Sequence, residues 1–250
     1  MSSDCHLFTS PHSSGILFDL IECIIERDFD YHTRHTRDGY VLVKRALKDP
    51  RYDKVVLILH SQGGIQGGLI VDMLLADLSG DDVHKLEVYT FAAAANHFNN
   101  PTRNQGGTKR NLIRHIEHYA NSADFVSRWG VLNFAKAPTH LTNHFVGTLF
   151  ERRGSGHMLN QHYLDTMFPL DPHTGQVAES NDFVEMLVDE GTIEGKQNRP
   201  AIDTKLATAL GHFTWSPHGT PGSLVAGNLK PVKELSRLWK YRNGLSPEDA

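Results

Sequence analysis

The sequence has little cysteine, no long apolar run and no excess of positive charge, and each shortage excludes a class of protein. Its 250 residues include two cysteines, Cys5 and Cys23, which are too few for a disulfide scaffold or a zinc site built from thiolates. No apolar run approaches the ~20 residues that a membrane-spanning helix needs, so no transmembrane segment is expected. The formal net charge of −4 argues against a nucleic-acid partner and offers no basic surface for anionic membranes.

The N-terminal stretch MSSDCHLFTSPHSS has neither a basic segment nor a long apolar segment. We therefore expect no signal peptide and a cytoplasmic location. Hydrophobic residues make up 39% of the chain, which is typical of a soluble globular protein.

Helical and strand patterns alternate along the first two thirds of the chain. Apolar residues recur at helical spacing in residues 15–27, 38–48, 63–78, 125–134 and 158–168. Strands are predicted at residues 54–60, 86–91, 111–119 and 144–151, with a shorter one at 6–10. The continuous aliphatic run at 54–60 is typical of a strand buried on both faces of a parallel sheet. The alternation predicts a three-layer α/β/α sandwich with a mostly parallel sheet.

Polar segments separate and follow this predicted core. Residues 96–110 are rich in Asn and Gly and are expected to form a surface loop. After about Phe168, Pro, Gly and polar residues dominate, so we expect a core at 1–168 and a partly irregular arm or lid at 169–250. Within this arm, short helices are predicted at 182–190, capped by Asn181, and at 232–241, with Pro231 in the first turn.

Histidine is abundant, with 16 residues, and is both a common metal ligand and the usual general base. His115 and His118 lie on a predicted strand, where residues three apart face opposite sides. His140 and His144 flank a turn-like stretch, and the sequence has no H-E-x-x-H motif and no Cys pair. We therefore expect no metal site.

The most informative segment is KVVLILHSQGGIQGG at residues 54–68, in which a predicted buried strand leads directly into Ser61 and then into a predicted helix. This is the context of a nucleophile elbow, a sharp turn that presents a serine hydroxyl at a helix N-terminus. There the helix dipole and the backbone N–H of Gln62 can stabilise an oxyanion. The alternative is a Ser-Gln-Gly-Gly turn that only begins a helix.

These residues resemble the serine lipases and esterases of the α/β-hydrolase superfamily, in particular class 3 lipases and fungal α/β-hydrolase-like proteins. Thr90-Phe91 is similar to a Thr-Phe stretch in those lipases, and the resemblance covers about residues 15–168. One position departs from the G-x-S-x-G pattern, because Leu59 stands where a glycine is usual.

The resemblance implies a triad in the order Ser, acid, His. Asp124 follows a predicted strand in an N-x-x-D-x-V stretch similar to that of the lipases and is the expected acid, although it could instead cap the helix at 125–134. His157, preceded by Gly154-Ser155-Gly156, is the expected base, and His162 is its competitor. These residues would perform acyl transfer as nucleophile, base and orienting acid.

An oxyanion hole needs a second donor besides the Gln62 amide, and the loop at residues 10–15 is in the expected position. Ser13 is the candidate, with a serine-rich helix cap as the alternative. A typical hydrolase sheet has more strands before this loop, so the chain is either a minimal version or shortened at its N-terminus.

The resemblance implies hydrolysis of a carboxylic ester, with a thioester as the alternative, through an acyl-enzyme and without a cofactor. The substrate would be a small-molecule or lipid ester. The alternative is a non-catalytic hydrolase-fold protein that binds a partner or serves as a scaffold. Leu59 and the alanine run at residues 92–95 favour this alternative, whereas three triad residue types in the required order favour the enzyme.

Overall fold

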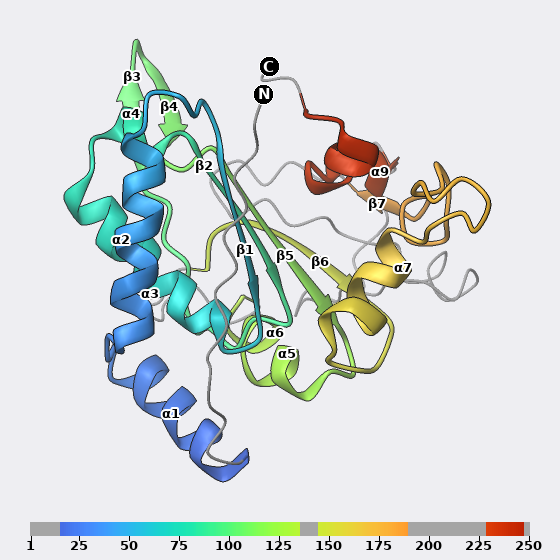
Figure 1. Ribbon diagram of the computed structural model, residues 1–250, viewed down its shortest axis with the longest axis horizontal. Coiled ribbons are helices and arrows are strands. Elements are labelled where there is room, and N and C mark those ends of the chain that lie inside the picture. Colours follow the sequence, from blue (N-terminus) through green and yellow to red (C-terminus); the bar gives the residue numbers. More distant parts are fainter. Residues whose placement is uncertain (1–15, 136–144, 190–228, 248–250) are drawn as a thin grey trace, which may run out of the picture.

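The computed structural model describes residues 16–135, 145–189 and 229–247 and has an α/β architecture (Figure 1). Its centre is a four-stranded sheet in the order β1-β2-β5-β6, and each neighbouring pair is parallel. The strands are β1 (Val55–His60), β2 (Leu86–Phe91), β5 (His115–Asn121) and β6 (Thr148–Arg152). The predicted α/β class and parallel sheet are therefore confirmed.

The longer helices lie in the first third of the chain, and shorter ones follow β5 and β6. The former are α1 (Ile16–Asp28), α2 (Arg34–Lys48) and α3 (Gly63–Asp77), and the single turn α4 (Gly80–Val83) follows them. The latter are α5 (Phe125–Trp129), α6 (Val131–Phe134), the π-helix η1 (Leu159–Leu164) and α7 (Asp165–Met167). None of the helices in the described residues is long and apolar enough to cross a membrane.

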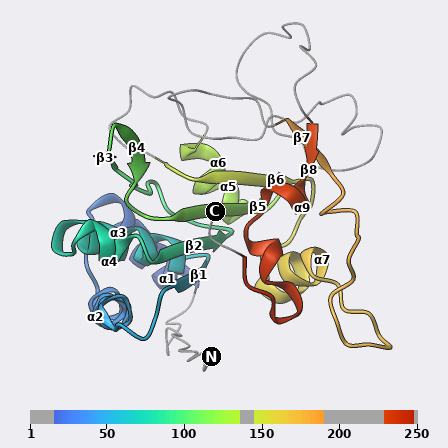
Figure 2. The same cartoon turned by 90° about the horizontal axis from the view of Figure 1, so that it is seen from above.

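Two apolar clusters cover the two faces of the sheet, because successive strand residues point to opposite faces. Val88 and Ile116 face a cluster that includes Leu74 of α3 and Leu132 of α6. The other face contributes the aromatic side chains of β2, β5 and β6, which pack against α7 and the C-terminal segment (Figure 2). This segment comprises β8 (Leu229–Pro231), α9 (Val232–Leu235) and the 3₁₀-helix η2 (Leu238–Gly244).

The prediction of a loop at residues 96–110 is wrong in its second half. There β3 (Thr102–Gln105) and β4 (Thr108–Asn111) form an antiparallel hairpin with a two-residue turn. Gly106 and Gly107 both have positive φ, +60° and +86°, as a type I′ turn requires. The side chains described on this hairpin are exposed, so the sequence shows none of the apolar alternation that normally indicates a strand.

The prediction that residues 54–60 are buried on both faces is also wrong. Val55, Leu57 and Leu59 pack toward the core, whereas Val56 and Ile58 are 40% and 56% exposed. In the described part of the chain β1 is an edge strand, and an aliphatic run does not distinguish an edge strand from a central one.

The arm differs from its prediction as well. Asn181 does accept hydrogen bonds from the amides of Phe183 and Val184, at 2.9 and 3.1 Å, but a turn follows instead of a helix. The chain then forms β7 (Leu187–Asp189), which pairs with β8. Burial of Phe183, Val184 and Met186 against the sheet outweighs the helical pattern.

Two further element predictions have other outcomes. Pro231 precedes a helix as predicted, but that helix breaks after Leu235 and continues as η2. The strand predicted at residues 6–10 lies outside the described residues.

Candidate active site

Ser61 lies in the sharp turn between β1 and α3, with φ at +58°. This left-handed conformation is unfavourable for a residue other than glycine and persists only when its surroundings fix it. Three backbone hydrogen bonds do so here. The Ser61 amide donates to the carbonyl of Phe91 at 3.1 Å, and its carbonyl accepts from the amides of Gly64 and Ala94 at 2.9 and 3.1 Å. The elbow is therefore fixed to the end of β2.

Leu59 is accommodated by a glycine on the facing helix. A Cβ added to Gly67 would lie 2.1 Å from Cδ1 of Leu59, so the leucine occupies the space that a side chain on α3 would need. A Cβ on Gly64 would likewise lie 2.7 Å from that of Ala93. Because α3 is glycine-rich where it crosses β1 and the loop after β2, the turn stays tight although the residue two before Ser61 is large.

The three predicted triad residues are joined by hydrogen bonds. Nε2 of His157 lies 2.8 Å from Oγ of Ser61, and Nδ1 of His157 lies 3.0 Å from Oδ2 of Asp124. A carboxylate can only accept, so Nδ1 carries the imidazole proton and Nε2 is left to accept the hydroxyl proton. This is the tautomer that a general base next to a serine requires.

Asp124 has both of the roles that the sequence left open. It is the N-cap of α5, where Oδ1 accepts from the Val126 amide at 2.9 Å, and it is the partner of His157. Burial opposes ionisation of this carboxyl, but hydrogen bonds from His157, Tyr163 and Val126 outweigh burial and lower its pKa below the ordinary value. Asp124 is therefore ionised at neutral pH.

Tyr163, a buried residue of η1 that was not predicted from the sequence, also contacts Asp124. Its hydroxyl donates to Oδ2 of Asp124 at 2.8 Å and accepts from the Asn121 amide at 3.0 Å. Burial raises the pKa of this phenol, so it remains a donor. No sequence motif marks a tyrosine so far from the aspartate that it contacts, apart from its position next to His162.

The loop that carries His157 is attached on two sides. The Ala123 amide donates to the carbonyl of Gly154 at 2.9 Å, which joins this loop to that of Asp124. On the other side, Nε2 of His60 lies 2.7 Å from the carbonyl of His157, and the two rings are 4.7 Å apart. Burial lowers the pKa of His60, so a neutral imidazole donates this bond.

His162, the competing base, has a structural position instead. Its Nδ1 accepts from the Met158 amide at 2.9 Å, and its ring lies against Gly156. Gly156 has φ at +95°, and a Cβ there would lie 2.4 Å from the His162 ring, so only glycine fits. The structure therefore brings His157, rather than His162, to Ser61.

Gln62 follows Ser61 at the N-terminus of α3, and its backbone N–H has no hydrogen-bond acceptor among the described residues. Its side chain donates to the buried carboxylate of Glu26 at 2.9 Å, and Gln66 donates to the same group at 3.1 Å. Helix α1 is thus bound to the turn that presents the amide. Ser13, the second oxyanion candidate, lies outside the described residues.

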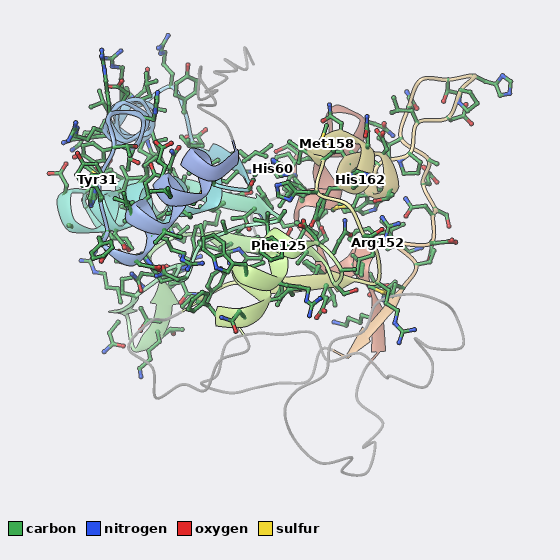
Figure 3. All side chains as sticks on the ribbon, turned by 90° about the horizontal axis from the view of Figure 1, so that it is seen from below. Tyr31, His60, Phe125, Arg152, Met158 and His162 are labelled. Carbon is green, nitrogen blue, oxygen red and sulfur yellow. The ribbon has the colours of Figure 1, made fainter. Side chains whose placement is uncertain are left out.

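Two exposed apolar residues directly follow triad members. Phe125, after Asp124, is 72% exposed, and Met158, after His157, is 56% exposed. Figure 3 looks at the end of the sheet where its strands terminate and shows both residues there with His60 and His162. The triad therefore has an apolar rim.

No group of three or more His, Cys, Asp or Glu within the described ranges is arranged to hold a metal ion. His118 is buried and contacts the Thr90 hydroxyl at 2.8 Å, and burial lowers its pKa to about 4. His115 points to the opposite face and pairs with Glu117 at 2.7 Å. His140 and His144 lie outside the described residues.

Comparisons with protein-family models, with curated proteins and with solved structures found no match for this chain. A strained serine, a base in the correct tautomer, an ionised acid and an open helix amide are the parts that an acyl-transfer site combines.

Proposed function

We propose that the protein is a serine hydrolase of the α/β-hydrolase superfamily that cleaves a carboxylic ester through an acyl-enzyme. The observation that carries the proposal is the continuous chain of hydrogen bonds from Ser61 through His157 to Asp124, which starts at a serine with φ at +58°. A structural serine needs neither that backbone conformation nor that partner.

The order of the strands supports the proposal. Ser61 follows β1, Asp124 follows β5 and His157 follows β6, so all three lie beyond the carboxyl ends of parallel strands. Open parallel sheets place their ligands at this edge. The chain order of nucleophile, acid and base is also that of α/β-hydrolases.

The geometry suggests the following mechanism. Oγ of Ser61 attacks the ester carbonyl while Nε2 of His157 takes the hydroxyl proton, and Asp124 stabilises the imidazolium. The Gln62 amide donates to the tetrahedral oxyanion. Collapse of this intermediate expels the alcohol, which receives the proton from His157, and water then attacks the acyl-enzyme by the same route. The exposed side chains of Phe125 and Met158 favour an ester with an apolar acyl group.

Labelling with a fluorophosphonate, followed by peptide mapping by mass spectrometry, tests the proposal. We expect one adduct per chain on Ser61. The labelling rate should fall by a factor on the order of 10⁶ in His157→Ala, because the hydroxyl then lacks its base.

His173→Ala is the matched control. His173 is exposed, and the hydrogen bond described for it is to Asp171 rather than to a triad residue. It should label as the unmodified protein does. A folded sample that forms no adduct would instead indicate a non-catalytic binding protein with the same arrangement of residues.

A further inference from the structure

A basic hollow lies at the end of the sheet where the strands begin. It has a volume of about 440 Å³, within the range of small-molecule sites. Its lining residues are His84, Lys109, Arg110, Asn111, Arg114, His115 and Arg237. They come from the loop before β2, the β3–β4 hairpin, the start of β5 and the C-terminal segment.

This hollow is separate from the triad. His115, which lines it, begins β5, and Asn121, whose side chain reaches the carbonyl of Gly156, ends that strand. At about 3.3 Å per residue the two positions are roughly 20 Å apart. Figure 1 shows the hairpin and α5 at opposite ends of the sheet.

The charge of the lining residues is almost entirely positive. The sequence has no Asp or Glu between Glu87 and Glu117, although this stretch carries four Lys or Arg residues. Among the described residues, neither Lys109 nor Arg110 forms an ion pair. Solvent or a bound anion would relieve their mutual repulsion.

Arg237 is a prepositioned part of this lining. Its side chain is 15% exposed and lies 2.8 Å from the fully buried carboxylate of Glu87. Its backbone amide donates to Glu117 at 2.6 Å. Glu87 fixes the side chain and Glu117 fixes the backbone amide, so Arg237 would lose little conformational entropy on contacting a ligand.

We propose that the hollow binds a phosphorylated small molecule, with the hairpin residues Lys109 and Arg110 and the arm residue Arg237 contacting its phosphate. A phosphate group carries nearly two negative charges at neutral pH and three acceptor oxygens. It therefore matches several converging cations, and arginine can bind it in a bidentate manner. A single carboxylate has one charge and two oxygens and satisfies the same lining less well.

Isothermal titration calorimetry of the full chain with sodium pyrophosphate, at fixed ionic strength, tests this site. We expect one-site binding that weakens as salt is added, with no comparable heat from sodium acetate. The double variant Lys109→Ala/Arg110→Ala should bind at least about tenfold more weakly, because it loses two charge-assisted contacts.

The control is Arg45→Ala/Lys240→Ala, which removes the same charge from exposed positions that do not line the hollow. It should bind pyrophosphate as the unmodified chain does. Equal weakening in both double variants, or no binding by the unmodified chain, would overturn the proposal. Binding to vesicles that contain phosphatidic acid, without binding to pyrophosphate, would overturn it too, since the ligand would then be a lipid surface. None of these results depends on labelling of Ser61.

Discussion

At the scale of single residues, Asp124 is the most constrained member of the site. Its two carboxylate oxygens accept from the Val126 amide, the Ser127 hydroxyl, the Tyr163 hydroxyl and His157. The side chain is 1% exposed, so water cannot replace a missing donor. Removing any one donor should therefore both destabilise the fold and loosen the orientation of the imidazole.

Tyr163→Phe separates these two effects. A hydrogen bond to a charged group contributes about 1.5–3 kcal/mol, so the free energy of unfolding should fall by about that amount. The fluorophosphonate labelling rate of Ser61 should fall about tenfold as Asp124 becomes less well fixed. Urea unfolding and labelling kinetics measure the two quantities.

Tyr31→Phe provides the control, because Tyr31 is 57% exposed. It should change neither quantity. If Tyr163→Phe lost stability but labelled at the unmodified rate, Tyr163 would have no role in positioning the triad.

The sequence could predict that Ser61, Asp124 and His157 lie together, because each follows a strand in an order that the resemblance supplies; their catalytic roles stay predictions. Tyr163 and His60 escaped prediction for a physical reason. Their hydrogen bonds join segments 39 and 97 residues apart, and no local pattern encodes such a contact.

At the scale of elements, β1 and α3 can cross closely because a large residue of β1, Leu59, faces a glycine of α3, Gly67. Leu59 fills the space over Gly67, and three atoms of its side chain lie within 3.0 Å of where a Cβ would be. Glycine inside a helix costs about 1 kcal/mol relative to alanine. At position 67, helix propensity therefore favours alanine, whereas packing against Leu59 requires glycine.

This opposition predicts that Gly67→Ala destabilises the protein by about 1–3 kcal/mol, as overpacking does. In a Leu59→Ala background the same change should become neutral or stabilising, because the helix gains propensity without a clash. Urea unfolding of the four proteins forms a double-mutant cycle.

Gly63→Ala is the matched control for stability, since a Cβ there has no heavy atom within 4 Å. It should not destabilise the fold. A cycle with no coupling between Leu59 and Gly67 would contradict this account of how the elbow tolerates the leucine.

Elements that follow a local period were predicted well, and elements set by tertiary contacts were not. Residues 86–91 form a strand as predicted, because each face meets apolar side chains. The hairpin at residues 102–111 and the turn after Asn181 were missed. In the first case the polar side chains give no alternating pattern that would indicate a strand. In the second, Val184 is buried against the sheet from a turn, and this tertiary contact replaces the predicted helix.

At the scale of the whole molecule, two buried glutamates on neighbouring central strands join the C-terminal segment to the sheet. Glu87 accepts from Arg237 and from the hydroxyls of Tyr89 and Tyr241. Glu117 accepts from the backbone amides of Arg237 and Leu238, at 2.6 and 3.2 Å. The C-terminal segment is thus fixed by the carboxylates of Glu87 and Glu117 as well as by the apolar cluster around Trp239.

This attachment makes stability depend on pH in a definite direction. Burial opposes ionisation of Glu87, but the bonds from Arg237, Tyr89 and Tyr241 outweigh it and hold its pKa below the ordinary value of 4.5. Its contribution to stability is therefore complete above pH 4.5 and is lost as the pH falls through the lower pKa of the folded state. Acid should weaken the attachment of the C-terminal segment.

Glu87→Gln tests the direction and the size of this effect. At pH 7 the variant leaves the largely buried Arg237 without its carboxylate, so the free energy of unfolding should fall by about 3 kcal/mol. The difference from the unmodified protein should shrink below pH 4.5, because protonation of Glu87 then removes from the unmodified protein the charge that the variant lacks at every pH. Glu234→Gln, at an exposed position of α9, should follow the unmodified protein throughout. Urea unfolding measures the difference in free energy of unfolding between Glu87→Gln and the unmodified protein. If this difference stayed constant from pH 7 to pH 3, altered packing or hydrogen bonding at position 87, rather than the lost charge, would weaken the attachment.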